Sequence, residues 1–123
     1  MRILVVDNQL RARKSMKALL GAWYPAAEVR EATDGYEAVQ LSEKFKPALI
    51  LMDARMPRMN GLEAVRQIKA KSPIIKIIVL SMYMDSKAEA LAAGADAFVS
   101  KSEPPEKIRE TLKDIFSSLE PKN

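Results

Sequence analysis

Residues 47–61 read PALILMDARMPRMNG, and this stretch carries the clearest fold signal in the chain. Residues 48–52 form an apolar run of the length of one strand, with no polar residue inside it. A strand that is buried on both faces reads as such a continuous run, whereas a half-buried strand alternates. Asp53 follows the run directly, and Asn60 with Glu63 three residues later is typical of a helix start. The stretch therefore predicts a buried strand that ends in an acid, then a loop and a helix.

Similar apolar runs recur along the chain and alternate with helical patterns. Strands are expected at residues 3–6, 29–32, 48–52, 74–80 and 97–99, with a helical stretch after each of them. The last of these helices carries an apolar stripe formed by Ile108, Leu112, Ile115, Phe116 and Leu119. Five strands that alternate with five helices predict an α/β fold, in which helices cover both faces of a doubly wound parallel sheet.

Turn and cap residues mark the expected helix boundaries. Pro25 and Pro47 stop the first two helices, and Gly94 is expected to cap the end of the fourth. Helix starts are expected at Asp34, Asn60 and Ser86, each followed three residues later by Glu, while Pro104 and Pro105 suit the first turn of the last helix.

The composition excludes several classes of site. The chain has 123 residues, of which 48% are hydrophobic and 29% charged, and residues 1–123 are expected to form a single domain without an output domain. It has no cysteine and no histidine, which excludes disulfides, thiolate metal sites, phosphohistidine and imidazole catalysis. No apolar run approaches the roughly 18 residues of a membrane span. No signal peptide is recognisable either, so a cytoplasmic location without membrane contact is expected.

The net charge of +4 comes from basic residues that are spread along the chain, with one dense group in the first helix. This group is expected to be a solvated helix face, and the alternative is contact with an acidic partner protein or nucleic acid. Its members are Arg11, Arg13, Lys14 and Lys17.

Polar residues follow four of the five apolar runs, each at the point where a strand is expected to end. They are Asp7 after the first run, Asp53 after the third, Ser81 after the fourth and Lys101 shortly after the fifth. Taken singly, each is more often a helix cap or a solvated side chain. Because the carboxyl ends of parallel strands lie at one edge of a sheet, where ligands bind, all four are expected to converge on one site.

These residue types suit phosphoryl transfer to a carboxylate. An aspartate is able to attack phosphorus as a covalent nucleophile and form an acyl phosphate. Such a transfer needs cations that position the group and neutralise its charge. Asp7 and Asp53 supply carboxylates for Mg²⁺. Lys101 and the Ser81 hydroxyl would each bind a phosphoryl oxygen.

The motifs resemble those of a known family. Residues 4–7 (LVVD), 53–61 (DARMPRMNG), 80–81 (LS), 94–95 (GA) and Lys101 are similar to the receiver domain of bacterial response regulators in two-component signalling, of the chemotaxis type. The resemblance covers essentially the whole chain and implies a flavodoxin-like fold with strand order 2-1-3-4-5. It also implies phosphotransfer to Asp53 from a histidine kinase or a histidine phosphotransfer protein, with Mg²⁺ as cofactor.

The resemblance further implies how the switch would work. Ser81 and Lys101 would contact the phosphoryl group, and Phe98 would be the switch aromatic. Arg55 and Tyr83 hold the positions that tune dephosphorylation. The surface of the fourth helix, fifth strand and fifth helix would then control a partner or a missing output domain. The domain would catalyse only its own phosphorylation and dephosphorylation, without binding nucleic acid directly, and a receiver homodimer is a further partner that the resemblance allows.

The metal site is where the sequence departs from the family. The resemblance implies Asp7, Asp53 and the backbone carbonyl of Arg55 as ligands, but Asn8 stands where the family usually has a second acid. An amide oxygen is still able to bind Mg²⁺, so Asn8 is a further candidate ligand, but the site loses a full charge. Weaker Mg²⁺ binding is therefore predicted. The alternative role of Asn8 is the N-cap of the first helix.

Two smaller departures concern the switch region. Ser102 stands where receivers commonly have a proline, and a cis bond before serine is disfavoured by about 2.5–4 kcal/mol, so a trans bond is expected. Phe98 lacks the hydroxyl of the commoner tyrosine. The loop residues Met56, Met59, Met82, Tyr83 and Met84 are expected to cover the sheet edge, and the alternative is an adaptable docking surface.

Three other classes of function remain as alternatives. A phosphorylation-independent scaffold with a degenerate site is conceivable because of Asn8. An aspartyl-phosphate phosphatase of the dehalogenase type would need a general acid where Arg55 stands. A dinucleotide enzyme would need a Gly-x-Gly-x-x-Gly motif after the first strand, and none is present.

Overall fold

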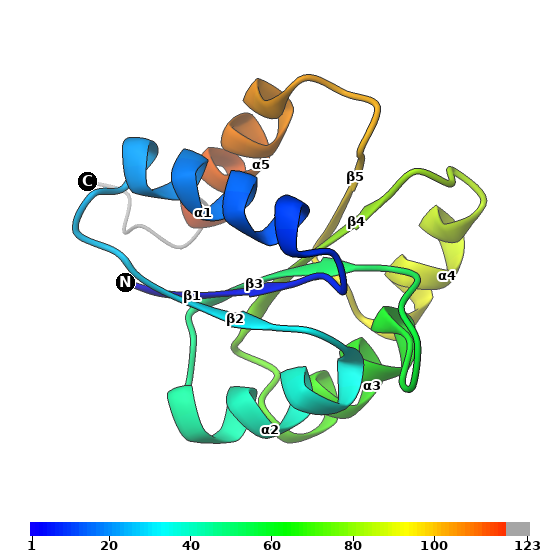
Figure 1. The fold of residues 1–123 in the computed structure, drawn as a ribbon. Coiled ribbons are helices and arrows are strands. Elements are labelled where there is room, and N and C mark those ends of the chain that lie inside the picture. Colours follow the sequence, from blue (N-terminus) through cyan, green and yellow to red (C-terminus); the bar gives the residue numbers. More distant parts are fainter. Residues whose placement is uncertain (118–123) are drawn as a thin grey trace.

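The structure is a computed structural model that describes residues 1–117. Strands and helices alternate along the chain (Figure 1). Their order is β1 (Arg2–Val6), α1 (Leu10–Trp23), β2 (Glu28–Ala32), α2 (Gly35–Phe45), β3 (Leu49–Asp53), α3 (Gly61–Lys71), β4 (Lys76–Ser81), α4 (Ser86–Ala93), β5 (Ala97–Ser100) and α5 (Pro105–Ser117). The predicted alternation of five strands with five helices is confirmed.

All neighbouring strands pair in parallel, in the order β2-β1-β3-β4-β5. Helices α1 and α5 lie on one face of the sheet, and α2, α3 and α4 lie on the other (Figure 1). The doubly wound, flavodoxin-like fold and its strand order are therefore confirmed. Because every strand runs the same way, the carboxyl ends of β1, β3 and β4 meet at one edge.

The central strand explains why its apolar run is continuous. Alternate residues of β3 face opposite sides, so Ile50 and Met52 pack under α2, α3 and α4. Leu49 and Leu51 pack under α1 and α5. All four side chains are at most 1% exposed. Full burial of an aliphatic side chain contributes about 1.5–3 kcal/mol, so this strand anchors both layers of the fold.

Two predicted helix starts have the expected cap geometry. The Asp34 Oδ1 atom accepts a hydrogen bond of 2.8 Å from the Glu37 amide at the start of α2. The Asn60 Oδ1 atom accepts a corresponding bond of 2.9 Å from the Glu63 amide in α3. Gly94 ends α4 with a φ of 111°, which glycine adopts without strain. These three predictions are confirmed.

Two other cap predictions are wrong. The residue before α4 is Asp85, not Ser86, and Asp85 makes no side-chain cap hydrogen bond. Helix α1 is preceded by Gln9, so Asn8 is not its N-cap. In both places polar residues stand next to one another in the sequence, and the local pattern does not tell which of them precedes the helix.

The fourth strand begins later than predicted. β4 covers Lys76–Ser81, whereas Ile74 lies in the turn before it and is 86% exposed. The Ile75 amide donates to the Ser72 carbonyl, which bends the chain at this point. An apolar residue beside a strand was therefore mistaken for part of it.

The loop between β3 and α3 is fixed by main-chain contacts. The Gly61 amide donates to the Ala54 carbonyl over 3.0 Å, and the Gly35 amide of α2 donates to the Met59 carbonyl over 2.9 Å. A Cβ atom at Gly61 would lie 1.9 Å from the backbone oxygen of Asp53, closer than any real contact. Only glycine fits there, and the loop after Asp53 is held from both ends.

The last helix packs as predicted over the described part of its stripe. Ile108 and Leu112 are buried, and Ile115 and Phe116 are partly buried against the same core cluster. Leu119 lies outside the described residues.

Within residues 1–117, no helix has the length and apolar character needed to cross a lipid bilayer.

Candidate functional site

Three of the predicted polar residues meet at the carboxyl edge of the sheet. The Lys101 ammonium lies 2.9 Å from Asp7 Oδ2 and 3.3 Å from Asp53 Oδ1. The backbone of Lys101 is fixed as well, because its amide donates to the Ser81 carbonyl over 2.8 Å. The structure thus brings the ends of β1, β3 and β4 and the residue after β5 together.

Asp53, Ser81 and Lys101 line an open pocket of about 320 Å³, and Asp7 contacts Lys101 beside it. Asp53 is 9% exposed and Ser81 is 2% exposed, so both are reached only from the pocket. The Ser81 hydroxyl oxygen accepts a hydrogen bond of 3.0 Å from the Tyr83 amide. The pocket is lined by Asn8, Gln9, Asp53, Arg55, Ser81, Met82, Tyr83 and Lys101. A water molecule occupies about 30 Å³ in the liquid, so the pocket has room for a phosphoryl group and a hydrated ion.

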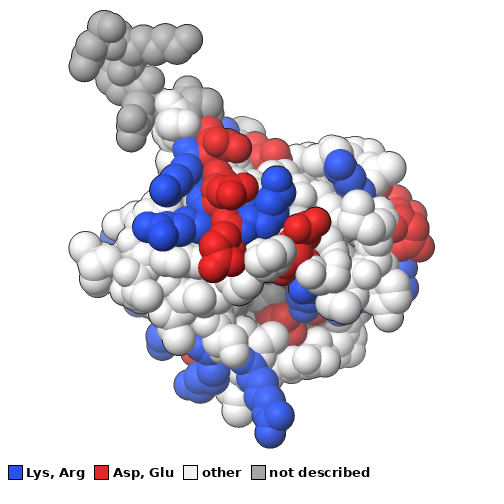
Figure 2. All heavy atoms as spheres, turned by 90° about the horizontal axis from the view of Figure 1, so that it is seen from above, with Lys and Arg blue, Asp and Glu red and all other residues white. Residues whose placement is uncertain are grey.

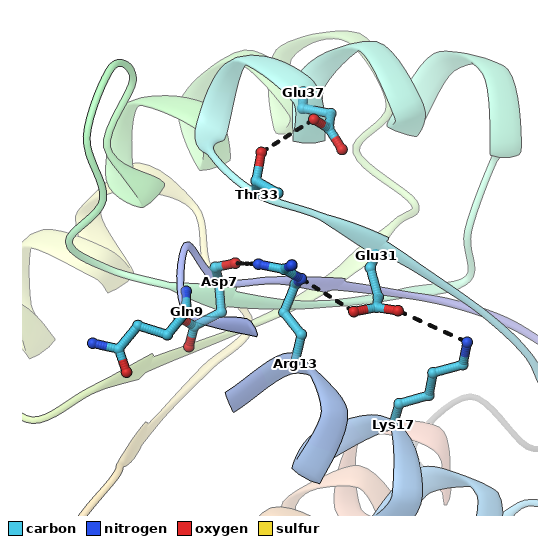
Figure 3. Close-up of polar contacts among 7 residues, drawn as sticks. All are labelled: Asp7, Gln9, Arg13, Lys17, Glu31, Thr33 and Glu37. Carbon is cyan, nitrogen blue, oxygen red and sulfur yellow. Dashed lines mark hydrogen bonds and ion pairs between the residues drawn. The ribbon is translucent and has the colours of Figure 1, made fainter. Parts of the chain in front are cut away.

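Asp7 is held by more than Lys101. Its Oδ1 atom accepts from the Gln9 amide over 2.9 Å, and its backbone carbonyl accepts from Arg13 Nη1 over 2.7 Å (Figure 3). Arg13 Nε in turn lies 3.1 Å from Glu31 Oε1, and Lys17 lies 3.8 Å from the other Glu31 oxygen. Helix α1 and strand β2 therefore both help to fix the end of β1.

The basic group of α1 is only partly the solvated face that was predicted. The Arg13 side chain is 12% exposed and makes the contacts described above, so for Arg13 the prediction is wrong. Arg11 and Lys14 are exposed. Figure 2 shows the face covered by α1 and α5. Acidic side chains lie among the basic ones on this face and interrupt the basic surface. No sequence signal distinguished Arg13 from its neighbours, because its partners lie far away in the chain.

The charges in the pocket shift the pKa values of Asp53 and Lys101. Burial raises the pKa of the Asp53 carboxyl above 3.8, and the nearby Asp7 raises it further, although Lys101 opposes the shift. Burial by itself would lower the pKa of Lys101, but the hydrogen bond to Asp7 and the charge of Asp53 outweigh it, so the pKa of Lys101 lies above 10.5. At neutral pH the ammonium therefore stays charged between the two carboxyl groups.

The directions in which Asp7 and Lys101 shift the Asp53 pKa predict the effect of replacing each of them. The Asp53 pKa is expected to fall in Asp7→Asn, which removes a negative charge, and to rise in Lys101→Met, which removes a positive one. Because the folded-state pKa lies above 3.8, protonated Asp53 stabilises the fold below pH 3.8, and this contribution is lost as pH rises through the folded-state pKa. Carboxyl ¹³C NMR titration measures these pKa values, with Asp53→Asn identifying the resonance. Shifts in the same direction for both variants would contradict the assignment.

The outer wall of the pocket is formed by Arg55 and the loop after β4. The Arg55 guanidinium lies 3.9 Å from the centre of the Tyr83 ring, and its Nη2 atom lies 3.3 Å from Asp85 Oδ1. Both predicted tuning residues thus border the pocket and contact each other, and Arg55 also pairs with an acid that the sequence motifs do not single out. Residues Met82, Tyr83 and Met84 are 61%, 52% and 59% exposed.

The remaining predicted residues have mixed outcomes. Met56 and Met59 pack against the core as expected, whereas Met82 lines the pocket and is, like Met84, more than half exposed. Phe98 is partly buried against the core cluster beneath α2, α3 and α4. The bond before Ser102 is trans, as predicted, since the described residues contain no cis peptide.

The donor set fits a hard cation. Asp53 and the exposed Asn8 line the pocket with a carboxylate and an amide oxygen, and Asp7, next in the chain to Asn8, offers a second carboxylate. Residues 1–117 contain no group of three or more His, Cys, Asp or Glu side chains arranged around a metal position. Mg²⁺ is commonly held by one or two carboxylates, with water and phosphate oxygens completing its shell, so two acids suffice. The cation would share both acids with Lys101.

Comparison with known proteins identifies the family. A family model described as the response regulator receiver domain matches residues 3–113. The chemotaxis protein CheY of Thermotoga maritima is 38% identical, and the match covers 93% of this chain and 96% of that protein. The transcriptional regulatory protein DegU of Brevibacillus brevis is 32% identical over 92% of this chain and 49% of its own length.

A solved structure agrees with these sequence relatives. The response regulator protein TrrA from Thermotoga maritima, in complex with Mg²⁺-BeF, is 31% identical and superposes with a TM-score of 0.84. The match covers 93% of this chain and 97% of that one. For three of the curated relatives, this chain spans only 35% to 53% of their length.

Proposed function

This chain belongs to the response regulator receiver domain family, whose members are phosphorylation-dependent signalling switches, and from that premise we propose that Asp53 is its phospho-acceptor. The observation that carries the proposal is the contact of Lys101, which lines the pocket, with both Asp53 and Asp7. A partly buried ammonium between two acids is placed to neutralise an incoming phosphoryl group. Residues 1–123 would act as one receiver domain.

In the proposed reaction an Asp53 carboxylate oxygen attacks phosphorus. The new O–P bond forms as the P–N bond to a phosphohistidine breaks, and the leaving imidazole takes up a proton. The donor would be a histidine kinase or a histidine phosphotransfer protein. Lys101 would move part of its contact from the carboxylate to a phosphoryl oxygen. The Ser81 hydroxyl would donate a hydrogen bond to another phosphoryl oxygen.

A divalent cation belongs to this proposal. Asp7, Asp53 and the backbone carbonyl of Arg55 would hold Mg²⁺, with Asn8 as a further oxygen donor. When bound, Mg²⁺ neutralises charge on the phosphoryl oxygens and orients them. Support comes from the all-oxygen donor set of the pocket and from the relative that was solved with Mg²⁺-BeF.

Signal output would follow from the state of the pocket. Ser81 lies next in the chain to the loop that leads to α4, and Phe98 lies on the neighbouring strand β5, opposite Val79. The surface formed by α4, β5 and α5 would change and control a partner, an output domain or a second receiver. Arg55 and Tyr83, which border the pocket, would set how fast water removes the phosphoryl group.

Incubation of the chain with acetyl phosphate and Mg²⁺ tests the proposal. Intact-mass spectrometry should show the gain of one phosphoryl group, which hydroxylamine removes because it is an acyl phosphate. Peptide fragmentation should place the modification on Asp53. A chain that stays unmodified under conditions that label another receiver would contradict the proposal and favour the phosphorylation-independent scaffold.

The scaffold alternative rests on Asn8, and it leads to a metal-affinity prediction. Asn8→Asp is expected to tighten Mg²⁺ binding on the order of tenfold, because affinity rises with the number of charged ligands. Isothermal titration calorimetry measures the change. Asn60→Asp is the matched control, since it adds the same charge at the α3 cap outside the acceptor pocket. Equal affinity of wild type and Asn8→Asp would show that position 8 does not contact the metal.

A further inference from the structure

Helix α4 starts differently from α2 and α3, the two other helices on its face of the sheet. Asp34 and Asn60, which precede α2 and α3, have extended backbones and accept a hydrogen bond from the third residue of their helix. Asp85, which precedes α4, is also a residue type that caps well, but it has helical backbone angles (φ −65°, ψ −17°) and caps nothing. The start of α4 therefore lacks a stabilising contact that its sequence is equipped to make.

The Asp85 carboxylate is engaged elsewhere. Both of its oxygens face Arg55 Nη2, at 3.3 Å and 3.5 Å. The contact joins the loop after β3 to the loop after β4, across the outer wall of the acceptor pocket. The same guanidinium stacks on Tyr83, which belongs to the second of these loops.

A second Asp–Arg pair shows that pairing and capping are compatible in principle. Asp34 Oδ2 lies 3.2 Å from Arg58, which belongs to the same loop as Arg55, while Asp34 Oδ1 caps α2. Asp85 differs because its backbone angles point the carboxylate away from the helix. To cap α4, Asp85 would need to leave Arg55 and adopt an extended ψ.

The Arg55 guanidinium also borders a second site, the acceptor pocket, where it could bind a phosphoryl group. It lines the acceptor pocket together with Asp53, and it lines the neighbouring pocket beside Asp85 as well. A phosphoryl group on Asp53 would bring about two negative charges and three acceptor oxygens into the first pocket. Bidentate arginine–phosphate contacts are among the stronger hydrogen-bonded pairs, whereas Asp85 is a single, largely exposed carboxylate.

We propose that Asp85 and a phosphoryl group on Asp53 compete for Arg55, and that the release of Asp85 lets it cap α4. Asp85 is then a positioning residue that acts through Arg55 and connects the acceptor pocket to the start of α4. The inference rests on the proposed function, since it requires phosphorylation of Asp53. The loop that changes, residues 82–85, is exposed, so the change breaks the turn hydrogen bonds that the Ser86 and Lys87 amides donate to the Tyr83 and Met84 carbonyls but no core contact.

Beryllium fluoride with Mg²⁺, a stable mimic of the phosphoryl group, serves as the probe. Asp85→Asn is expected to tighten its binding about two- to fivefold, because Arg55 no longer has to leave an ion partner. In an Arg55→Gln background the same substitution should have no effect, which separates the exchange from a simple loss of negative charge. Glu89→Gln is the matched control, because Glu89 lines the pocket beside Asp85 but has no contact with Arg55 among those described. An equal effect of Asp85→Asn in both backgrounds, or none in either, would overturn the proposal.

Amide hydrogen exchange provides the second readout. Ala88 holds the position in α4 that Glu37 holds in α2, so its amide is the one that Asp85 would protect. Protection of Ala88 should rise when wild type binds beryllium fluoride, and this rise should be absent in Asp85→Ala. In Asp85→Asn, which keeps the capping ability, protection should already be raised without the probe. A wild type that binds no probe contradicts the proposed function itself, whereas a wild type that binds it with unchanged Ala88 exchange contradicts only the exchange of partners.

Discussion

Replacement of Asp53 by asparagine is expected to abolish phosphoryl uptake from acetyl phosphate. An amide oxygen does not form a stable acyl phosphate, whereas Lys101 keeps its contact of 2.9 Å with Asp7, so the rest of the pocket stays in place. Time-resolved intact-mass spectrometry with Mg²⁺ measures uptake. Wild type should become modified, and Asp53→Asn should remain unmodified over the same period.

Loss of uptake in this variant would not reflect unfolding. Burial raises the pKa of Asp53, which means that the ionised carboxylate is less stable in the fold than in the unfolded chain. An uncharged asparagine avoids this penalty, and thermal unfolding at neutral pH should show a variant at least as stable as wild type. Asp34→Asn is the matched control, because it changes another buried aspartate of the same edge and retains the cap of α2. Undiminished labelling of Asp53→Asn would move the acceptor to another residue, with Asp7 the first to examine.

Replacement of Gly61 by alanine is expected to have the largest effect on stability. The added Cβ atom would lie 1.9 Å from the Asp53 carbonyl oxygen, and that oxygen is backbone, so it cannot turn aside. Either α3 or the end of β3 has to move, at a cost of about 3 kcal/mol or more in unfolding free energy. Since the end of β3 carries Asp53, phosphoryl uptake should fall as well.

Gly21→Ala gives the contrast that isolates the steric cause. Gly21 lies inside α1 and has nothing within 4 Å of the added atom. Alanine is favoured over glycine within a helix by up to about 1 kcal/mol, so this variant should be as stable as wild type or more stable. Urea unfolding of both variants measures the difference. Similar unfolding free energies for Gly61→Ala and wild type would refute the close approach.

The convergence of Asp7, Asp53 and Lys101 was predictable because strand order and direction follow from the pattern of apolar runs. Once the strands are parallel, residues just past their ends must share an edge, whatever their distance in the sequence. The hydrophobic runs and the caps at Asp34 and Asn60 are local signals, and they led to correct elements. This part of the site is therefore a consequence of topology.

The contacts of Arg13 and Asp85 were not predictable in the same way. Arg13 and its partner Glu31 are 18 residues apart, and Arg55 and Asp85 are 30 apart. The pairing of charged side chains that are far apart in the sequence depends on how loops and helices pack. No local sequence pattern predicts this pairing. Ser86 shows the limit on a smaller scale, since adjacent Asp85 and Ser86 are both suited to a cap by residue type, yet α4 begins at Ser86 and Asp85 makes no cap hydrogen bond.

The two loops beside the acceptor are held in place by different kinds of contact. The one after β3 is held by main-chain hydrogen bonds at Gly35 and Gly61, which tie it to α2 and α3. The main-chain hydrogen bonds of the one after β4 are local turns that end at Ser86 and Lys87, and it is joined to Arg55 by exposed side chains. Main-chain anchoring next to a buried strand opens only with large parts of the fold, but an exposed side-chain contact exchanges on a much faster timescale. Substitutions that alter phosphoryl transfer to Asp53 and substitutions that alter the response to it therefore fall at different positions. Among descendants of such a gene, substitutions at positions 55, 83 and 85 would change the speed and threshold of the response while the acceptor strand is inherited unchanged.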